Sequence, residues 1–525
     1  MKLKNFFQKK TNNPNREKLG LIAAITAFLA LTLPTLASAS IWFDEAFSAY
    51  LVRYDFAKIW HFTSVDVHPP LYYFALKVWT MLFGTSDFAL RSMSVFFGVL
   101  TLIAAFYLIK RIFKSTKTAV ISTMFLAISP MFVRYAQEVR MYMMVAFLAV
   151  VTVRAYYEIY HAKNSEKAKK YWRIIFVLSA AAGIWTQYLS GLTLVALWLW
   201  RAFAMRKSFK KAKKWEFVKQ FFSEKFFALN AWIVGLFLPW TPFFVVQAIS
   251  VKSAFWIQDL SFNTLPNYIS NFFTYVNSGD LNGWWSLLLF VLVGALGLAL
   301  AKNKLFSKEE RADFNFILAM AGLPAVILFL LSMPPAKSIF IDRYTLSGMI
   351  FIALVIGVLI VKLWPKDRKL AMILAILTVI AFGYGNFEIN HQRGFSKSSN
   401  ETIQTRQMIS RIKELAKSGE PIITTAGYFY YEMAQYSTPE NPTFFKDLED
   451  YKVGSLKMLE EAEAEKITDL TKFSQKYKTI WVLYGWGETE KAPLQNNWKL
   501  EFQEVHKDPL SGRNRYLIQK FSVQE

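Results

Sequence analysis

Two carboxylates stand side by side at Asp44 and Glu45, in the sequence IWFDEAFS, directly after the first long apolar stretch of the chain. A charged side chain is costly within hydrocarbon, so a carboxylate at the end of an apolar helix is placed where it can face water. A positioned carboxylate can take a proton from a hydroxyl group. We therefore interpret Asp44 as the leading candidate for a general base, with Glu45 as a second catalytic candidate. A solvated pair that only marks a helix end is the competing interpretation.

A second polar group, Asp66 and His68, lies in the sequence DVHPPLYY. The two prolines that follow restrict the backbone and predict a stiff start to the next helix, with Asp66 and His68 held at its N-terminal end. Asp66 could equally cap that helix, so a plain helix start is the alternative.

Two further segments carry polar and charged side chains between apolar stretches. Their candidate binding residues are Tyr135, Gln137, Glu138, Arg140 and Tyr142 in RYAQEVRMY, and Lys337, Arg343 and Tyr344 in AKSIFIDRY. The planar guanidinium of arginine can bind a phosphate through two parallel hydrogen bonds, so these cations could hold an anionic substrate. Anchoring at lipid headgroups is the competing interpretation.

The chain that must position these residues is poor in charge: 54% of its 525 residues are hydrophobic and 19% are charged. Soluble proteins have about a quarter charged residues, so the deficit predicts a membrane protein. The net charge of +23 does not indicate nucleic acid, because residues before 386 hold 42 basic and 18 acidic residues and the rest hold 19 and 20. The excess belongs to the apolar part. The absence of cysteine excludes disulfides, thiolate metal sites and cysteine nucleophiles.

Eleven apolar stretches are long enough to cross or nearly cross a bilayer. They lie at about 20–39, 89–109, 118–133, 141–158, 174–186, 188–204, 227–248, 284–300, 313–332, 345–361 and 370–385. With the N-terminus in the cytoplasm, the inside segments hold 32 Lys and Arg and the outside loops hold 8. This asymmetry predicts that orientation, and an odd number of spans predicts a C-terminal domain outside the cytoplasm. The sequence LASAS, ending at Ser40, would also fit a cleaved signal peptide, but the apolar stretch before it is nearer a full span.

The segments between the spans predict how a site could be built. The first outer loop, 40–88, contains aromatic and partly charged segments that suit helices lying in the membrane interface. The second, 249–283, is rich in Asn, Ser and Phe and predicts a mobile flap. A membrane domain is expected over 1–395 and an α/β domain over 396–525, with helices at 401–417, 430–436 and 455–470 and strands at 421–427, 479–485, 499–506 and 514–521.

Taken together and in this order, the motifs resemble a known family. WFDEA after the first span, D-x-HPPLYY in the first outer loop, ALR at 89–91, SPMFVRYAQEVRMY after the third span and DRY before a late span are similar to the bacterial glycosyltransferases of the GT-C fold. The most similar group contains the protein O-mannosyltransferases and the lipid A aminoarabinose transferases. The resemblance covers about residues 20–350. Gln187, in WTQYLS, is a further candidate binding residue, but it departs from the resemblance, because many relatives have His there.

The resemblance implies a polytopic all-α domain that transfers a hexose such as mannose, or a pentose, from a polyprenyl-phosphate donor to a glycan, lipid or protein acceptor at the outer face of the cytoplasmic membrane. Asp44 would take the proton of the acceptor hydroxyl. Arg343, with Arg140 and Lys337 as seconds, would stabilise the charge on the leaving lipid phosphate. Glu45, Asp66 and His68 would orient acceptor or sugar or, with Asp44, hold a divalent metal ion, since these residue types suit either use.

A polytopic transporter, or a lipid or polysaccharide flippase, is the alternative function. Such proteins usually place ionisable groups at the middle of the membrane and often contain inverted repeats or broken helices. Here Arg154 is the clearest charge deep inside a predicted span, and no internal repeat is visible. A ligand sensor would not explain the acidic first loop. The pattern therefore favours the glycosyltransferase, with the lipid-linked donor, membrane lipids and the acceptor as partners and no nucleic acid.

Overall fold

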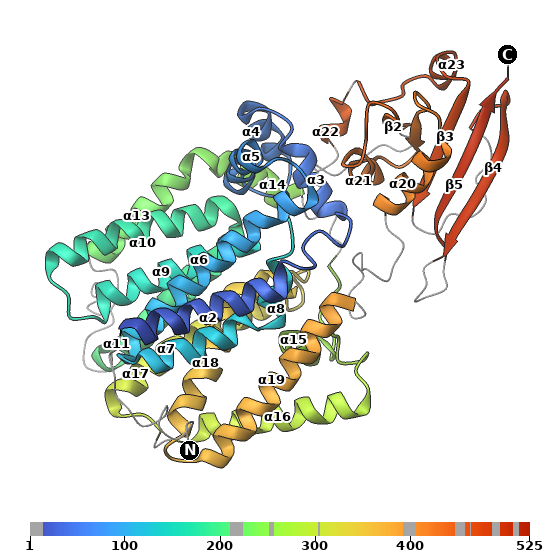
Figure 1. Ribbon diagram of the computed structural model, residues 1–525. Coiled ribbons are helices and arrows are strands. Elements are labelled where there is room, and N and C mark those ends of the chain that lie inside the picture. Colours follow the sequence, from blue (N-terminus) through green and yellow to red (C-terminus); the bar gives the residue numbers. More distant parts are fainter. Residues whose placement is uncertain are drawn as a thin grey trace.

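A computed structural model describes residues 14–209, 224–250, 257–302, 305–391, 405–446, 457–462, 464–485, 494–507 and 514–524. Helices form one bundle as far as residue 391, and a small α/β domain lies at one end of that bundle (Figure 1). The predicted fold class, a helical membrane domain followed by an α/β domain, is confirmed.

The bundle contains long helices and a set of short ones at the end that meets the α/β domain. The long ones are α2 (Pro14–Thr32), α6 (Asp87–Phe113), α7 (Thr116–Ala127), α9 (Tyr142–Tyr160), α10 (Glu166–Thr186), α11 (Gly191–Phe209), α13 (Glu224–Phe237), α16 (Gly283–Ala301), α17 (Lys308–Leu331), α18 (Leu346–Leu363) and α19 (Arg368–His391). The short ones are α3 (Phe43–Leu51), α4 (Phe56–Val65), α5 (Leu71–Phe83), α8 (Pro130–Tyr135), α14 (Thr241–Ser250) and α15 (Thr264–Thr274).

All eleven predicted stretches contain a helix, but their lengths differ. Within the described ranges, eight helices are long and apolar enough to cross a membrane. The other three are α2, whose first turns carry Glu17 and Lys18, α7, which has 12 residues, and α10, which starts with a charged turn at Glu166. Eight crossings follow from length and composition, and eleven stay a prediction.

Two predicted stretches are interrupted by proline. The first was expected to continue to residue 39, but α2 ends at Thr32, because Pro34 cannot donate the next helical hydrogen bond. The third is divided at Ser129, after which Pro130 starts the short helix α8. Asp44 therefore does not follow a span directly: a loop of ten residues, 33–42, separates α2 from α3.

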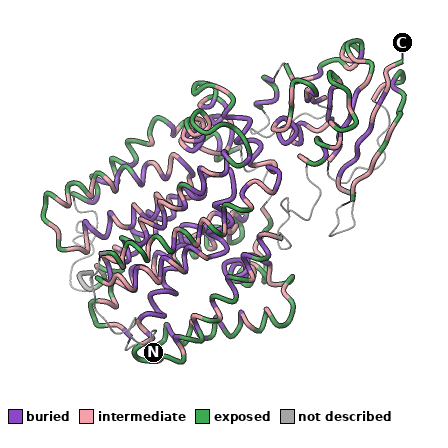
Figure 2. The backbone as a smooth tube through the Cα atoms, viewed as in Figure 1, coloured by how far each residue is buried: buried purple, intermediate pink, exposed green. Residues whose placement is uncertain are grey.

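The helices on the outside of the bundle are exposed, most clearly α13 and α16 (Figure 2), and many of their exposed residues are large and apolar. Trp232 on α13 and Phe290 on α16 expose 66% and 78% of their surface. Contiguous apolar surface of this extent is unfavourable in water and is expected where a helix faces lipid. This is the surface of a multi-pass membrane protein.

The first outer loop has the expected helices, and the second contains a packed helix that was not expected. Helices α3, α4 and α5 occupy the first loop, which confirms the predicted helices. The second loop was predicted to be a mobile flap, and this is wrong for its central part. There α15 buries Phe272 and Phe273, whose rings lie 5.9 Å and 6.0 Å from that of Phe382 on α19. The aromatic residues that made the loop look irregular form a packed helix face.

The C-terminal domain holds a five-stranded sheet in the order β2-β1-β3-β5-β4. Its strands are β1 (Ile422–Thr424), β2 (Thr443–Phe445), β3 (Thr479–Gly485), β4 (Trp498–Lys507) and β5 (Asn514–Val523). β1 pairs in parallel with β2 and β3, and β5 pairs antiparallel with β3 and β4. Helices α20 (Thr405–Leu415) and α21 (Gly427–Ala434) pack on it, with the short helices α22 (Lys457–Glu460) and α23 (Leu470–Ser474) at its margin.

Most of this domain matches the prediction. Strand β2 was not predicted: β1 is equally short but lies in the β-branched run IITT, whereas TFF in β2 has one β-branched residue and gives a weaker strand pattern. The helix predicted over 455–470 is wrong in its described part, where four residues of α22 are helical and Lys466 forms a bridge to Phe445. Residues 401–404 of the predicted helix 401–417 lie outside the described residues.

Candidate functional site

The carboxylate of Asp44 lies opposite the guanidinium of Arg343, with 3.3 Å between Asp44 Oδ2 and Arg343 Nη1. Asp44 is in the first turn of α3, and Arg343 is in the 3-10 turn η4 (Asp342–Thr345) from which α18 continues. The Asp44 side chain keeps 22% of its surface exposed and that of Arg343 keeps 9%. The structure thus brings the predicted base and the predicted phosphate-binding cation into one partly open site.

A second arginine reaches the same helix end. Arg140 Nη1 donates to the Asp44 backbone oxygen at 3.2 Å and to Ser48 Oγ at 3.4 Å. Arg140 is 5% exposed, so its charge is poorly solvated. Two arginines therefore surround the start of α3, one at the Asp44 carboxylate and one at its backbone, and the local field favours an anion.

Glu45 points to a different face of α3 and is fully engaged. Its carboxylate oxygens accept from Arg91 Nε at 2.9 Å and from Arg91 Nη2 at 2.7 Å, and Oε1 also accepts from the Val139 N–H at 2.9 Å. The Glu45 side chain is 1% exposed. Because both oxygens are occupied and shielded from solvent, this geometry favours a positioning role for Glu45 over the predicted catalytic one. Sequence reasoning missed the partner, although Arg91 stands in the ALR motif.

Asp66, which is buried, pairs with the half-buried His68, with 3.5 Å between Asp66 Oδ2 and His68 Nδ1. Burial lowers the pKa of His68, although its neighbour Asp66 acts in the opposite direction. Within the ranges that the structure describes, no three His, Asp or Glu side chains gather as the ligands of a metal ion would. The four residues considered as metal ligands thus divide into the Asp66–His68 pair, the Asp44–Arg343 pair and the Glu45–Arg91 pair.

Helix α8 and the residues between it and the start of α9 provide a buried polar layer beside this site. Arg134 Nη2 forms an ion pair with Glu138 Oε1 at 3.0 Å, and Arg134 Nε donates to the Tyr275 hydroxyl, which follows α15, at 3.3 Å. The rings of Tyr135 and Tyr142 lie 5.2 Å apart. Glu138 therefore neutralises the charge of Arg134. Tyr142 lies near the guanidinium groups of Arg140 and Arg343.

The remaining predicted residues fall into two groups. Tyr344 lies next to its neighbour Arg343, whose guanidinium carbon is 5.9 Å from the Tyr344 ring centre, and Asp342 of the same turn accepts from Asn271 Nδ2 at 2.6 Å. Gln187 is buried at the end of α10. Lys337, by contrast, is exposed, so the structure leaves it outside the buried part of the site.

Two tyrosines that the sequence analysis did not select carry buried hydroxyl groups. Among the described residues, no hydrogen-bond partner lies near the hydroxyls of Tyr72 and Tyr73, nor near Gln137 Nε2, Arg140 Nε and Gln187 Nε2. A buried polar group without a partner costs about 1–3 kcal/mol. Tyr72 and Tyr73 both lie near Arg140, so their hydroxyls indicate room for a polar ligand beside that arginine. Both tyrosines stand in the HPPLYY motif, but the sequence does not show that their hydroxyl groups are buried.

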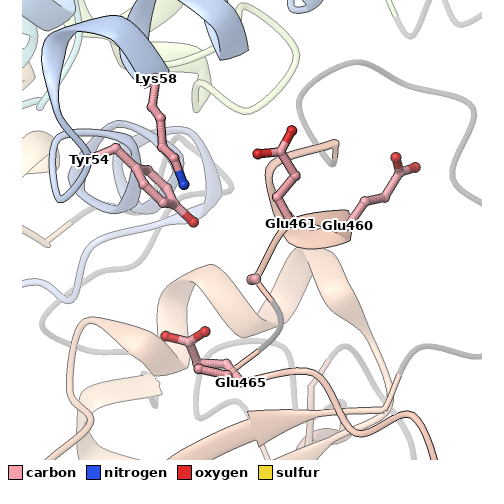
Figure 3. A pocket seen from close by; sticks show the side chains of 7 residues that line it. Tyr54, Lys58, Glu460, Glu461 and Glu465 are labelled. Atoms are coloured by element: carbon pink, nitrogen blue, oxygen red, sulfur yellow. The ribbon is translucent and has the colours of Figure 1, made fainter.

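A separate cavity of about 540 Å³ lies where α4 approaches the C-terminal domain, and Figure 3 shows Lys58 and Tyr54 facing the acidic side chains across it. It is lined by Tyr54, Lys58, Glu460, Glu461, Ala462, Ala464 and Glu465. Asp44 and Arg343 are not among these residues, so we assign the cavity no part in the site around Asp44.

Comparison with protein families gives a match within the helical bundle. Residues 67–222 match the model of the family described as dolichyl-phosphate-mannose-protein mannosyltransferase. That range includes the HPPLYY and RYAQEVRMY segments, but not Asp44 or Arg343. No curated protein sequence matches the chain.

Solved structures resemble the chain over nearly its whole length. ArnT from Cupriavidus metallidurans in the apo state is similar with a TM-score of 0.58 and 14% identity, over 97% of this chain and 98% of that one. ArnT from the same organism bound to undecaprenyl phosphate is similar with a TM-score of 0.57 and 14% identity, over 95% of this chain and 97% of that one. A third similar structure is the archaeal oligosaccharyltransferase AglB from Archaeoglobus fulgidus in complex with an inhibitory peptide and a dolichol-phosphate. Its TM-score is 0.50 and its identity 10%, over 89% of this chain and 69% of that one. The shared fold and the family match confirm the predicted resemblance: the chain is a membrane protein of the GT-C fold whose residues 67–222 match the dolichyl-phosphate-mannose-protein mannosyltransferase family.

Proposed function

We propose that this protein is a membrane glycosyltransferase that moves a sugar from a polyprenyl-phosphate donor to an acceptor at the outer face of the cytoplasmic membrane. The observation that carries the proposal is the contact between the Asp44 carboxylate and the Arg343 guanidinium, with Arg140 at the same helix end. A base and two poorly solvated cations side by side are what transfer from a lipid phosphate requires. The family match at residues 67–222 and the fold shared with a protein bound to undecaprenyl phosphate support the same donor class.

In the proposed reaction an acceptor hydroxyl oxygen attacks the anomeric carbon of the donor sugar. Asp44 takes the hydroxyl proton, and the bond between the anomeric carbon and the phosphate oxygen breaks. The lipid phosphate leaves with the electron pair of that bond, and Arg343 and Arg140 stabilise its developing charge. Because these cations are largely buried, the stabilisation is stronger than it would be in water.

The Asp44–Arg343 contact adds a link between donor binding and catalysis. Arg343 donates to the Asp44 carboxylate. A donor phosphate competes for the Arg343 guanidinium and leaves Asp44 able to accept a proton from the acceptor. The unpartnered hydroxyls of Tyr72 and Tyr73 are then suited to donate to sugar or phosphate oxygens.

The sugar that we propose is a hexose such as mannose or a pentose, and the acceptor is a glycan, lipid or protein. The test incubates the purified full-length protein in lipid nanodiscs with polyprenyl phosphates that carry different single sugars, and follows release of free lipid phosphate by mass spectrometry. Wild type should release the lipid phosphate from at least one donor, and Asp44→Asn should release it at least about a hundredfold more slowly. Equal release by both proteins from every donor would contradict the proposal.

A further inference from the structure

One arginine of the helical bundle binds the loop that leads to Asp44. Arg91 on α6 donates from Nη1 to the Leu36 and Ala39 backbone oxygens at 2.9 Å and 2.7 Å, and from Nη2 to the Ser40 backbone oxygen at 3.0 Å. Its two bonds to Glu45 bring the total to five, which is the full donor capacity of a guanidinium. Arg91 therefore gathers the loop 33–42 and the first turn of α3 around one group.

The same loop is held from the other side by the C-terminal domain. Arg406 on α20 donates to the backbone oxygens of Ala37 and Ser38, and its own N–H donates to Ser40 Oγ at 3.2 Å. Arg406 Nη1 also lies 3.3 Å from Asp87 Oδ2 at the start of α6. One side chain of the C-terminal domain thus binds both the loop and the helix that carries Arg91.

Tyr436, which follows α21, completes the contact. Its hydroxyl accepts from the Ile41 N–H at 3.0 Å and donates to Asp87 Oδ2 at 2.8 Å. Ile41 is three residues before Asp44. Asp87 is 7% exposed and receives donors from Arg406 and Tyr436, so it is the buried anchor on the membrane side. We call Arg406, Tyr436 and Asp87 the interdomain clamp.

Helix α3 itself packs against the C-terminal domain. Phe43, Phe47 and Tyr50 recur at helical spacing on one face, and their ring centres lie 6.2 Å, 6.0 Å and 5.2 Å from that of Tyr431 on α21. Arg53, just after α3, donates to the Ala434 backbone oxygen at 2.8 Å. A helix of nine residues is not stable alone. Its position therefore depends on its neighbours, and α21 covers one whole face.

We propose that the C-terminal domain is a working part of the active site, in which Arg406 and Tyr436 are positioning residues that hold the loop 33–42 and α3 so that Asp44 meets Arg343. The inference rests on the proposed function. Neither residue touches the reacting atoms. Their effect is geometric: a displacement of about 1 Å in a catalytic group can cost about a hundredfold in rate. Arg343 and Arg140 belong to other segments of the bundle, so donor binding does not need the clamp.

The experiment compares Arg406→Ala, Arg406→Lys and Tyr436→Phe with Arg411→Ala as the matched control. Arg411 lies on the same helix α20, but its ion pairs are with Glu414 and Glu504 inside the C-terminal domain. We expect kcat to fall about 10- to 100-fold in Arg406→Ala and less in Tyr436→Phe, with KM for the lipid donor unchanged. Arg406→Lys, which keeps a cation for Asp87 and the loop, should recover part of the loss, and Arg411→Ala should match wild type.

Two further measurements separate positioning from a loss of folding and from failure of the proposed function. In the double variant Arg406→Ala with Asp44→Asn, the Arg406 change should cost little beyond Asp44→Asn alone, because it acts through Asp44. Hydrogen exchange of the peptide that contains Ile41 to Ala46 should be faster in Arg406→Ala than in Arg411→Ala at equal melting temperature, and this readout needs no enzymatic activity. Unchanged hydrogen exchange and unchanged kcat in Arg406→Ala would contradict the positioning role proposed for the interdomain clamp. Faster exchange in a protein whose wild type transfers no sugar would instead overturn the proposed function and leave the clamp intact.

Discussion

Asp44 and Arg343 contact each other, but the proposed roles of the two residues differ, so their substitutions should have different effects. Asp44→Asn keeps the size and shape of the side chain and removes its basicity. We expect turnover to fall at least about a hundredfold, with donor affinity largely retained, because the arginines stay in place. The measurement is kcat, together with equilibrium binding of the lipid donor.

Asp55 offers a matched control for this change. It is exposed and caps α4, where its carboxylate accepts from the Lys58 N–H at 2.8 Å. Asn caps helices as well as Asp, so Asp55→Asn should leave turnover near wild type. Near-normal turnover of Asp44→Asn would reject its role as the base.

Arg343 should depend on the shape of its side chain as well as on its charge. If it only anchored α18 to headgroups, Lys would replace it with little loss. A bidentate bond to phosphate requires the planar fork, so Arg343→Lys should still lower kcat/KM for the lipid donor. Arg343→Ala should lose about 2–4 kcal/mol of transition-state stabilisation, by analogy with removal of one oxyanion donor.

Arg368, exposed at the start of α19, provides the comparison for this series. Arg368→Lys should have no effect on kcat/KM at matched thermal melting. Equal activity of wild type and Arg343→Lys would reject the bidentate role, and equal activity of Arg343→Ala as well would reject any part in donor recognition.

Among the elements, α7 and α18 approach each other so closely that one position requires glycine. A Cβ built on Gly357 would lie 2.4 Å from Ser122 Cα and 2.8 Å from Ser122 N. Small residues let membrane helices pack backbone against backbone, and this contact connects the segment that follows Arg343 to the centre of the bundle. Gly357→Ala should therefore lower the melting temperature of the purified protein.

Gly297, on the lipid-facing helix α16, is the control for this substitution. Apart from the adjacent turns of its own helix, no atom of the described residues lies within 4 Å of a Cβ built there. Gly297→Ala should leave the melting temperature unchanged or raise it slightly, because Ala favours helix over Gly. A melting temperature for Gly357→Ala equal to that of wild type would show that the two helices can separate without cost.

Helix α21, which packs against α3, buries a carboxyl group that should make stability depend on pH. Burial raises the pKa of Glu432 from 4.5 to about 7, although Thr405 donates to its carboxylate at 2.7 Å and opposes the change. Arg515 also lowers this pKa, and the charge of Glu45 raises it. Between about pH 4.5 and pH 7 the folded state keeps a proton that the unfolded state releases, so stability should fall as pH rises through that window.

The test of this pH dependence is the melting temperature of wild type and Glu432→Gln from pH 4.5 to 8. Wild type should lose stability as pH rises, and the neutral amide should reduce that slope. Glu414→Gln, which changes an exposed carboxylate on α20, should keep the wild-type slope. Parallel curves for wild type and Glu432→Gln would exclude the buried carboxyl as the cause.

At the scale of the whole molecule, the asymmetry of 32 against 8 cations predicts its orientation in the membrane. The N-terminus should lie in the cytoplasm, and the C-terminal domain outside it. A reporter that is active only in the cytoplasm, fused after residue 395, should give no signal. The same reporter fused within the basic segment 201–226 should be active. A strong signal from the first fusion would overturn the orientation and place the Asp44 site on the cytoplasmic side.

The sequence by itself determined the elements and the kind of chemistry. The backbone N–H and C=O groups of a long apolar stretch in lipid form their hydrogen bonds within a helix, so hydropathy located the helices of the bundle. The costly placement of Asp44 and Arg343 beside apolar stretches marked both as functional candidates. The strands β3, β4 and β5 were found because each has seven or more residues, long enough for a β pattern to be visible.

Only the tertiary structure decided which charged groups face one another. Asp44 and Glu45 are adjacent in sequence, and no local rule distinguishes them. Yet a rotation of 100° per helical residue directs Asp44 toward Arg343 and Glu45 toward Arg91. These partners lie 299 and 46 residues away in the chain, and Arg406, which binds the loop before α3, comes from another domain. Pairing over such distances is set by packing of the whole bundle, which residue types and spacing do not specify. The different partners of Asp44, Glu45 and Arg406, on which the proposed roles rest, therefore became visible only in the folded chain.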